Sequence, residues 1–388
     1  MTGGPWPHER AGSSHRIEAI QTIGSSARNT TMSLVLRGVS VIAGAIVVLV
    51  GSDTGHSSPM QTLRASTLEG RPIGRLQARL DRGGGRVFLP RLAGGRCYTT
   101  RGLWVSHSGT HITSDGACLR VVAPGPVRLH SSDGDAIAAT AAFFVSRSSP
   151  RAPPPSDVVI SGLRIIVAPG AGDGIDVYGD HVRITGVEIE GSPLDGIYIG
   201  GRTSPSGRAR YVAVTHSVVQ RAARNAVSVT SAVHVQITGN VLAGAAGVAG
   251  PGAGVDVEPN APSNPIFDVS IVDNFIVGNA GSGVELALHA NTGLPLRASR
   301  ISIANNLIVG NALLRSNGGV LIAGGQLDGR GRVSIVGNRF ESNGGPAVSL
   351  TRALRMRLRV QRNQRESTRK TMASRYACAR ALRSNRRD

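Results

Sequence analysis

Lysine is almost absent from this sequence: Lys370 is the one lysine among 43 Lys and Arg residues in a chain of 388. A phosphate-binding loop that ends in Gly-Lys-Ser/Thr is therefore excluded, and a Schiff-base lysine is disfavoured. The sequence also has no His-Glu-x-x-His, Cys-x-x-Cys or Gly-x-Ser-x-Gly segment. These absences exclude the motifs of many metalloproteases, thiol oxidoreductases and serine hydrolases.

Aromatic residues are also scarce, at 3% of the chain, so a core built on large rings is not expected. The 51 glycines and 20 prolines disfavour long helices. Hydrophobic residues at 40% and charged residues at 17% are enough for a folded core and unlike a disordered chain.

The net charge of +19 is unevenly spread, since thirteen of the 43 Lys and Arg residues lie in 352–388. Nearly all of the basic residues are arginine rather than lysine, which indicates base-composition bias in the gene rather than selection for a polyanion partner. We therefore expect no nucleic-acid partner. No dedicated protein partner is evident, and we expect a monomer.

The N-terminal part of the chain is typical of an export signal. Residues 39–50 form an apolar run of twelve residues, which suits a signal-peptide core better than a membrane span of ~20. We expect 32–55 to be a signal peptide, or alternatively an N-terminal membrane anchor, and the protein to be secreted or at the cell surface. Residues 1–31 are interpreted as a mis-annotated extension.

An internal repeat dominates the rest of the sequence. Seven segments alternate apolar and other residues with a period of two, which is typical of a strand with one buried face. They start at Val158, Val182, Val212, Val235, Val269, Ile301 and Val333. Each is followed by a second strand, at 174–177, 196–199, 226–229, 254–257, 283–286, 319–322 and 347–350.

One first strand and the second strand that follows it make up one coil. A single coil is too short to bury its own apolar face, so the coils must stack and share one continuous core. Val255, Val257, Val284 and Leu286 are expected to point into that core. Asn240, Asn274, Asn306 and Asn338 share one register, and we expect their amides to form a structural ladder from coil to coil.

The repeat resembles the right-handed parallel β-helix of the pectate-lyase-like family. Residues 73–90, IGRLQARLDRGGGRVFLP, are similar to that family's opening, with a short capping helix, a Gly-rich turn and a first strand. The resemblance implies an all-β solenoid over 56–363. The repeat ends there, and we expect the basic segment 364–388 to be a disordered tail. The resemblance also implies that Cys97 and Cys118 lie one coil apart and form a disulfide, the alternative being two unpaired core residues.

Candidate site residues lie between the inward positions of the second strands, where side chains point outward. Asp256 and Glu285 would be neighbours on adjacent coils, and Glu258 shares their face. We expect these three carboxylates to face a solvent-open groove as catalytic residues. The expected substrate-binding residues are Asp176 and Tyr198 in the same face and Arg202, His289 and Arg297 in the loops beside it.

Two like charges ~5 Å apart raise one pKa and hold the other down, as acid–base chemistry at a glycosidic bond requires. The same three carboxylates, Asp256, Glu258 and Glu285, could instead hold Ca²⁺. The histidines His181, His216 and His234 flank first strands, and we expect them to be structural. Asp173 and Asp195 precede glycines and are interpreted as turn formers.

Two hypotheses on function remain open. The first is an exported polysaccharide-modifying enzyme, either a lyase or a glycoside hydrolase, and the four long loops after the second strands favour it. The second is a non-catalytic surface protein that binds a polysaccharide or cell-surface glycan. The resemblance fits both, because a fold does not fix its chemistry.

Overall fold

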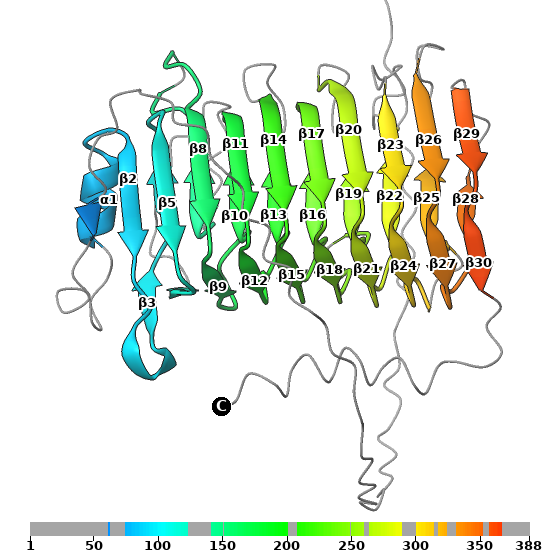
Figure 1. The fold of residues 1–388 in the computed structure, drawn as a ribbon, viewed down its shortest axis with the longest axis horizontal. Coiled ribbons are helices and arrows are strands. Elements are labelled where there is room, and N and C mark those ends of the chain that lie inside the picture. The colour runs from blue at the N-terminus through cyan, green and yellow to red at the C-terminus, as the bar shows by residue number, and fades with distance from the viewer. Residues whose placement is uncertain are drawn as a thin grey trace, which may run out of the picture. The chain divides into compact units, whose positions relative to one another are not determined.

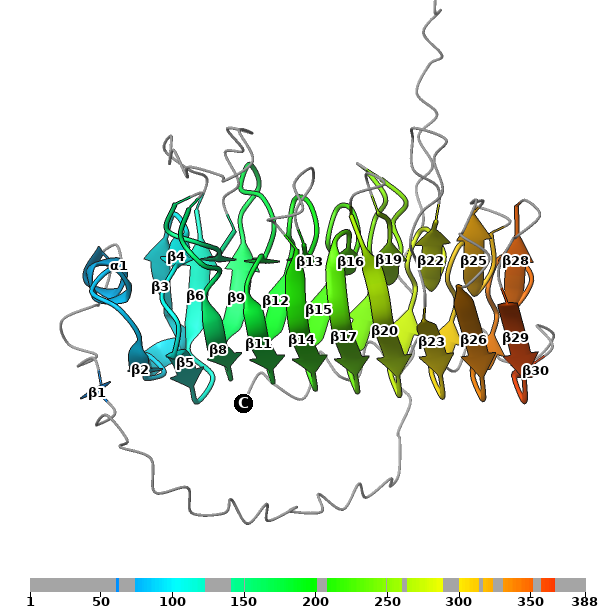
Figure 2. The same ribbon diagram turned by 90° about the horizontal axis from the view of Figure 1, so that it is seen from above.

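The computed structural model describes residues 61–62, 74–122, 141–149, 151–200, 208–248, 250–259, 264–288, 300–313, 317–323, 331–351 and 357–366. In these residues the chain winds through three parallel sheets, which extend along the same axis (Figures 1 and 2). We name them sheets A, B and C. From β8 onward the chain passes from sheet A to B to C and back to A in every coil.

The eleven strands of sheet A are β1 Gln61–Thr62, β2 Gly85–Leu89, β5 Thr110–Ser114, β8 Ser156–Ser161, β11 Asp180–Thr185, β14 Ala209–Thr215, β17 Ala232–Thr238, β20 Ile266–Val272, β23 Ile301–Ala304, β26 Arg332–Val336 and β29 Arg357–Gln361. The ten strands of sheet B are β3 Cys97–Thr100, β6 Cys118–Val121, β9 Arg164–Val167, β12 Glu188–Glu190, β15 Val218–Gln220, β18 Val241–Ala243, β21 Phe275–Val277, β24 Leu307–Val309, β27 Arg339–Glu341 and β30 Gln364–Glu366. The nine strands of sheet C are β4 Leu103–Val105, β7 Phe143–Val145, β10 Ile175–Val177, β13 Ile197–Ile199, β16 Val227–Val229, β19 Val255–Val257, β22 Val284–Ala287, β25 Val320–Ala323 and β28 Val348–Leu350.

The helix α1, Gly74–Leu80, stands at the start of the solenoid (Figure 2). It buries Leu76 and Leu80 in the core. It corresponds to the capping helix that the sequence predicted. One 3₁₀ turn, Ala93–Gly95, follows β2. In the described part of the chain, no helix combines the length and apolar character needed to cross a membrane.

The core consists of apolar side chains that stack from coil to coil. Val255, Val257, Val284 and Leu286 are fully buried, as the alternation predicted. The in-register pairs Val255↔Val284 and Val257↔Leu286 show how each coil continues the core of the one before. The all-β solenoid predicted from the sequence is therefore confirmed.

Each coil contains a strand that the sequence analysis did not separate. We expected two strands a coil, but the structure has three, because the strands of sheet B lie between those of sheets A and C. From β12 to β30 these strands are three residues long. Three residues are too few to show an alternating pattern, which explains why they were not predicted.

Asparagine ladders connect the coils at the turns on either side of sheet B. The Asn240 amide donates to Asn274, which donates to Asn306, and Asn306 donates to Asn338. This ladder confirms the prediction. A second ladder, Asn279 to Asn311 to Asn343, follows sheet B and was not expected.

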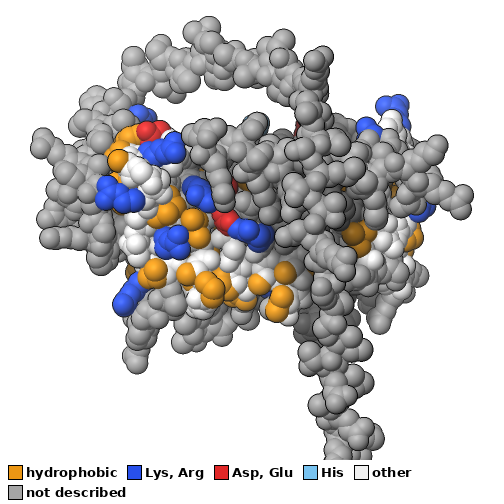
Figure 3. Space-filling view, turned by 90° about the horizontal axis from the view of Figure 1, so that it is seen from below, with side chains coloured by type: hydrophobic (Ala, Val, Ile, Leu, Met, Phe, Trp, Pro, Cys, Tyr) orange, Lys and Arg blue, Asp and Glu red, His pale blue; other side chains and the backbone are white. Residues whose placement is uncertain are grey.

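The strands of sheet B lie at the bottom of Figure 1, and Figure 3 shows the molecule from below. This outer face carries hydrophobic and arginine side chains. Arg164 forms ion pairs with Glu188 and Glu190 across neighbouring coils. Arg221 also pairs with Glu190. These contacts link neighbouring coils of the solenoid.

Several predicted segments lie outside the described residues. These are the expected extension 1–31, the expected signal or anchor 32–55, and 367–388 in the basic tail. The last described strand, β30, ends at Glu366.

Candidate functional site

The outward residues of sheet C form one column. The register pairs Asp176 with Tyr198, Tyr198 with Ser228, Ser228 with Asp256, and Asp256 with Glu285. The acids Asp256 and Glu285 therefore occupy neighbouring positions on β19 and β22, one rung or ~4.8 Å apart. The alternation in the sequence predicted this arrangement.

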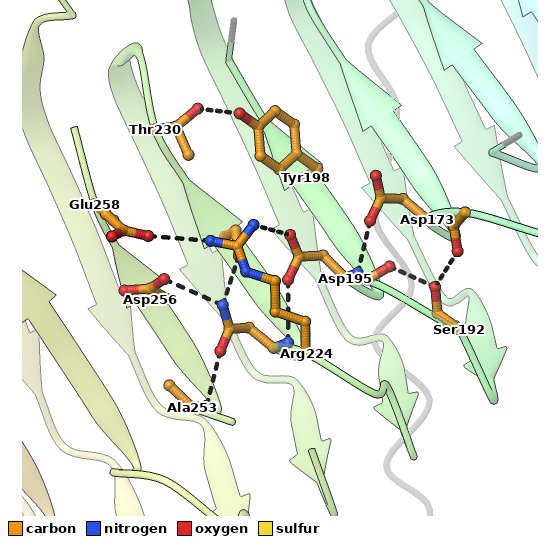
Figure 4. A network of polar contacts seen from close by, with 12 residues as sticks. Asp173, Ser192, Asp195, Tyr198, Arg224, Thr230, Ala253, Asp256 and Glu258 are labelled. Carbon is orange, nitrogen blue, oxygen red and sulfur yellow. Dashed lines mark hydrogen bonds and ion pairs between the residues drawn. The ribbon is translucent and has the colours of Figure 1, made fainter. Parts of the chain in front are cut away.

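Most of this column is covered in the described part of the chain, so the expected open groove was wrong for Asp176, Tyr198 and Asp256. Glu285, by contrast, is half-buried. Asp256 is 1% exposed, Tyr198 is 2% exposed and Asp176 is also buried. The turn between β15 and β16 brings Arg224 and Asn225 against Asp256 and its neighbours (Figure 4). An outward position in a solenoid strand is therefore not necessarily open to water.

Arg224 is the cation at the centre of the network. One terminal nitrogen lies 3.5 Å from Asp195 Oδ2, and the other donates to Glu258 Oε2 at 3.0 Å (Figure 4). Burial alone would lower the pKa of Arg224. The carboxyl groups of Asp195, Asp256 and Glu258 outweigh that effect and raise it above its usual value. Arg224 therefore stays charged and holds two acids from different coils.

Asn225 connects an acid of the coil before it with an acid of the coil after it. Its backbone N–H donates to Asp195 Oδ1 at 3.0 Å, and its side-chain amide donates to Asp256 Oδ2 at 3.1 Å. Its side-chain oxygen accepts from the backbone N–H of Ala253 at 2.8 Å. Asn225 thus fixes the orientation of Asp256 relative to Asp195.

Asp195 is a buried acid rather than a simple turn residue. Burial and the nearby Asp173 raise its pKa from 3.8 to about 7, although Arg224 partly opposes them. Asp173 also accepts a hydrogen bond from the backbone N–H of Asp195 at 2.6 Å. Asp195 can therefore take up or release a proton near neutral pH.

Asp256 is an almost completely buried acid of the network. Burial raises its pKa well above the usual value, and the negative charges of Glu258 and Glu285 raise it further. Its Oδ1 is buried and has no hydrogen-bond partner among the described residues. Asp256 therefore holds one buried oxygen that no neighbouring described group satisfies.

Of the remaining predicted residues, three lie in the described part of the chain and three lie outside it. Glu258 keeps 29% of its side chain exposed, and Glu285 is half-buried, so these two lie nearest to solvent. Tyr198 accepts a hydrogen bond from the Thr230 hydroxyl and presents no open ring face for a sugar. Arg202, His289 and Arg297 lie outside the described residues.

The residues of the cluster do not fit a calcium ion. Among the described residues, no group of three or more His, Cys, Asp or Glu side chains is arranged to hold a metal. The Arg224 guanidinium also lies among the carboxylates and pairs with Glu258. A cation therefore already lies beside Asp256 and Glu258, two of the three carboxylates that were expected to hold Ca²⁺.

Sequence reasoning missed Asp195, Arg224 and Asn225. The usable signal was a column of polar residues two positions before successive sheet C strands, namely Asp173, Asp195 and Asn225. Arg224 had no such signal, because its importance depends on where the turn places its side chain.

The two N-terminal cysteines lie on paired strands of sheet B. Cys97 on β3 is in register with Cys118 on β6, with 4.4 Å between their Cα atoms. Their sulfur atoms are bonded. The link therefore joins two successive coils at the start of the solenoid.

The comparisons with known proteins agree with this fold. The family model for the right-handed beta helix region matches residues 157–364. The chain therefore belongs to the right-handed β-helix family. No curated protein sequence is significantly similar to it.

Solved structures with a similar fold include three proteins that act on polysaccharides. The tailspike protein gp49 of Acinetobacter baumannii bacteriophage Fri1, a capsular polysaccharide depolymerase, is 15% identical with a TM-score of 0.40, covering 82% of this chain and 64% of its own. An alginate lyase from Paenibacillus sp. str. FPU-7 is 16% identical, with a TM-score of 0.41. The alignment covers 76% of this chain and 94% of the lyase. A single-site mutant of the periplasmic alginate epimerase AlgG is 12% identical, with a TM-score of 0.34. The alignment covers 72% of this chain and 77% of the epimerase. Similarity at this level does not indicate which reaction a chain catalyses.

Proposed function

We propose that the protein is an exported polysaccharide-modifying enzyme that cleaves glycosidic bonds at the acidic cluster of sheet C. The observation that carries this proposal is Asp256, a buried carboxyl with a raised pKa and an unpartnered oxygen beside Glu285. A protonated carboxyl can donate to the leaving oxygen while a neighbouring carboxylate acts as base or nucleophile. The partly exposed Glu258 marks where a polymer would reach the cluster.

The spacing and the state of Arg224 favour hydrolysis over elimination. Neighbouring rungs are ~4.8 Å apart, close to the ~5–5.5 Å between the carboxyl groups of retaining glycosidases. In a lyase, an arginine or lysine base would remove a proton from the sugar. Arg224 is held as a cation by Asp195 and Glu258, so it does not suit that role.

The second candidate is non-catalytic glycan binding. The burial of Asp256 and the ion pairs of Arg224 support it, because a closed network of this kind can also be purely structural. Export is supported by the apolar run 39–50, which has the length of a signal-peptide core.

The purified protein incubated with a panel of soluble polysaccharides, with and without calcium, tests the proposal. We expect new reducing ends without unsaturated products, and no requirement for calcium. Unsaturated products would replace hydrolysis with elimination. Binding without any product would favour the second candidate and contradict the enzyme.

A further inference from the structure

A groove crosses the outer face of sheet A, on a different sheet from the acidic cluster. It has a volume of about 530 Å³ and is lined by five successive strands, β8, β11, β14, β17 and β20. Polar side chains of these strands that line it include Arg183, Gln236 and Ser270. Its floor includes the small side chain of Ala213.

One register position of this groove has an unusual backbone. At this position each of the five strands has a non-glycine residue in the left-handed region, with φ between 51° and 61°. The residues are Asp157, His181, Tyr211, His234 and Asp268. The ladder pairing skips them, as between Asp180↔Arg210 and Val182↔Val212. A non-glycine residue pays for this conformation, and such strain gathers at functional positions.

The rings at this position stack on one another along the solenoid. His181 and Tyr211 lie 4.6 Å apart at 18°, and Tyr211 and His234 lie 4.6 Å apart at 13°. Stacking places the Tyr211 ring between two histidine rings and covers one face of each histidine, so the row mainly offers polar edges rather than a flat platform. The result is a row of hydrogen-bonding groups with one ring from each of three successive coils.

Acids flank the row and are already paired. Asp268 lies 2.8 Å from His234 Nδ1 and 3.3 Å from Arg300, while Asp157 lies 3.1 Å from His111 Nε2. The central ring is different, because Tyr211 is 48% exposed and its hydroxyl makes no hydrogen bond within the described residues. Tyr211 is therefore available to a ligand.

We propose that this groove is a second site, which binds a neutral, hydroxyl-rich glycan strand lying along the solenoid axis. The rung spacing of ~4.8 Å is close to the length of one sugar ring, so successive sugars would meet equivalent positions. The Tyr211 hydroxyl, the His181 imidazole and the Arg183 and Gln236 side chains supply the hydrogen bonds. Arg183 is the one arginine lining the groove, against two carboxylates, so a polyanion is disfavoured.

This second site is independent of the sheet C cluster and can be tested separately. The experiment is affinity electrophoresis of the whole protein in gels that contain single polysaccharides, both neutral and acidic. The test variant combines Tyr211→Phe, which keeps the ring stack, with Arg183→Gln. Arg120→Gln, on an exposed position of sheet B, is the matched control.

We expect at least one neutral polymer to retard the wild type and the Arg120→Gln control. The double variant should bind it about tenfold more weakly, as expected for the loss of two hydrogen bonds. The Arg120→Gln control should migrate like the wild type in every gel. Equal migration of wild type and double variant in every gel would overturn the second site. Retardation by acidic polymers alone would overturn the neutral ligand.

Discussion

Asp195 and Asp256 show how burial changes the chemistry of single residues in this protein. Both are aspartates in a crowded acidic network, and Arg224 is the nearby cation that both share. Burial is the largest cause of the raised pKa in each. Protonation of these residues is therefore coupled to the stability of the folded chain.

The contribution of Asp195 to the stability of the protein should fall as the pH rises from about 4 to 7. The pKa of Asp195 is about 7 in the folded state, and its ordinary value, which applies to the unfolded chain, is 3.8. Between these two values, only the folded state holds this proton. Each pH unit then costs at most about 1.4 kcal/mol of the free energy of unfolding, and the loss ends above the folded pKa. Thermal melts at several pH values should show a weaker slope for Asp195→Asn.

The matched control for this prediction is Asp273→Asn, at an exposed turn position where asparagine tolerates the left-handed backbone. Its pH slope should equal that of the wild type. Identical slopes for Asp195→Asn and the wild type would show that Asp195 has no raised pKa.

At the scale of the element, hydrogen bonds in the turns connect successive coils, as the strand ladders do. Asn306 accepts from the backbone and side chain of Asn274, and its amide donates to Ile271 and Asn338. All these groups lie at a buried turn. One side chain therefore satisfies polar groups from the preceding and following coils.

Asn306→Ala should lower the free energy of unfolding by about 2–4 kcal/mol, because several buried polar groups lose their partner. Urea unfolding followed by circular dichroism measures this loss. Asn363→Ala is the matched control at the less buried end of the same ladder, and it should cost less. Equal costs at the two positions would contradict a structural role for burial in the ladder.

Much of the fold could be predicted from the sequence, because the pattern of a strand is local. Alternation alone placed Val255 and Val257 inside and Asp256 on the opposite side. The pattern could not show that Asp256 is covered, since Arg224 and Asn225 reach it from the preceding coil. Nor could it show the groove, because the left-handed column that includes His181 and His234 is a backbone feature.

At the scale of the whole molecule, the solenoid separates its chemistry by sheet. The acidic cluster belongs to sheet C and the groove to sheet A, while sheet B carries ion pairs such as Arg164 with Glu190. Each coil pairs only with its neighbours in every sheet. Substitutions on one sheet should therefore leave the others intact, which makes the two proposed sites separable.

The turnover of Asp256→Asn on a polysaccharide cleaved by the wild type tests the central proposal most directly. An amide replaces a carboxyl whose pKa burial raises, so the fold should survive, as circular dichroism and melting would show. Turnover should fall at least about 100-fold, the usual contribution of a general acid. Glu188→Gln on sheet B is the control and should keep full activity. A folded Asp256→Asn protein with unchanged turnover would contradict the proposed site.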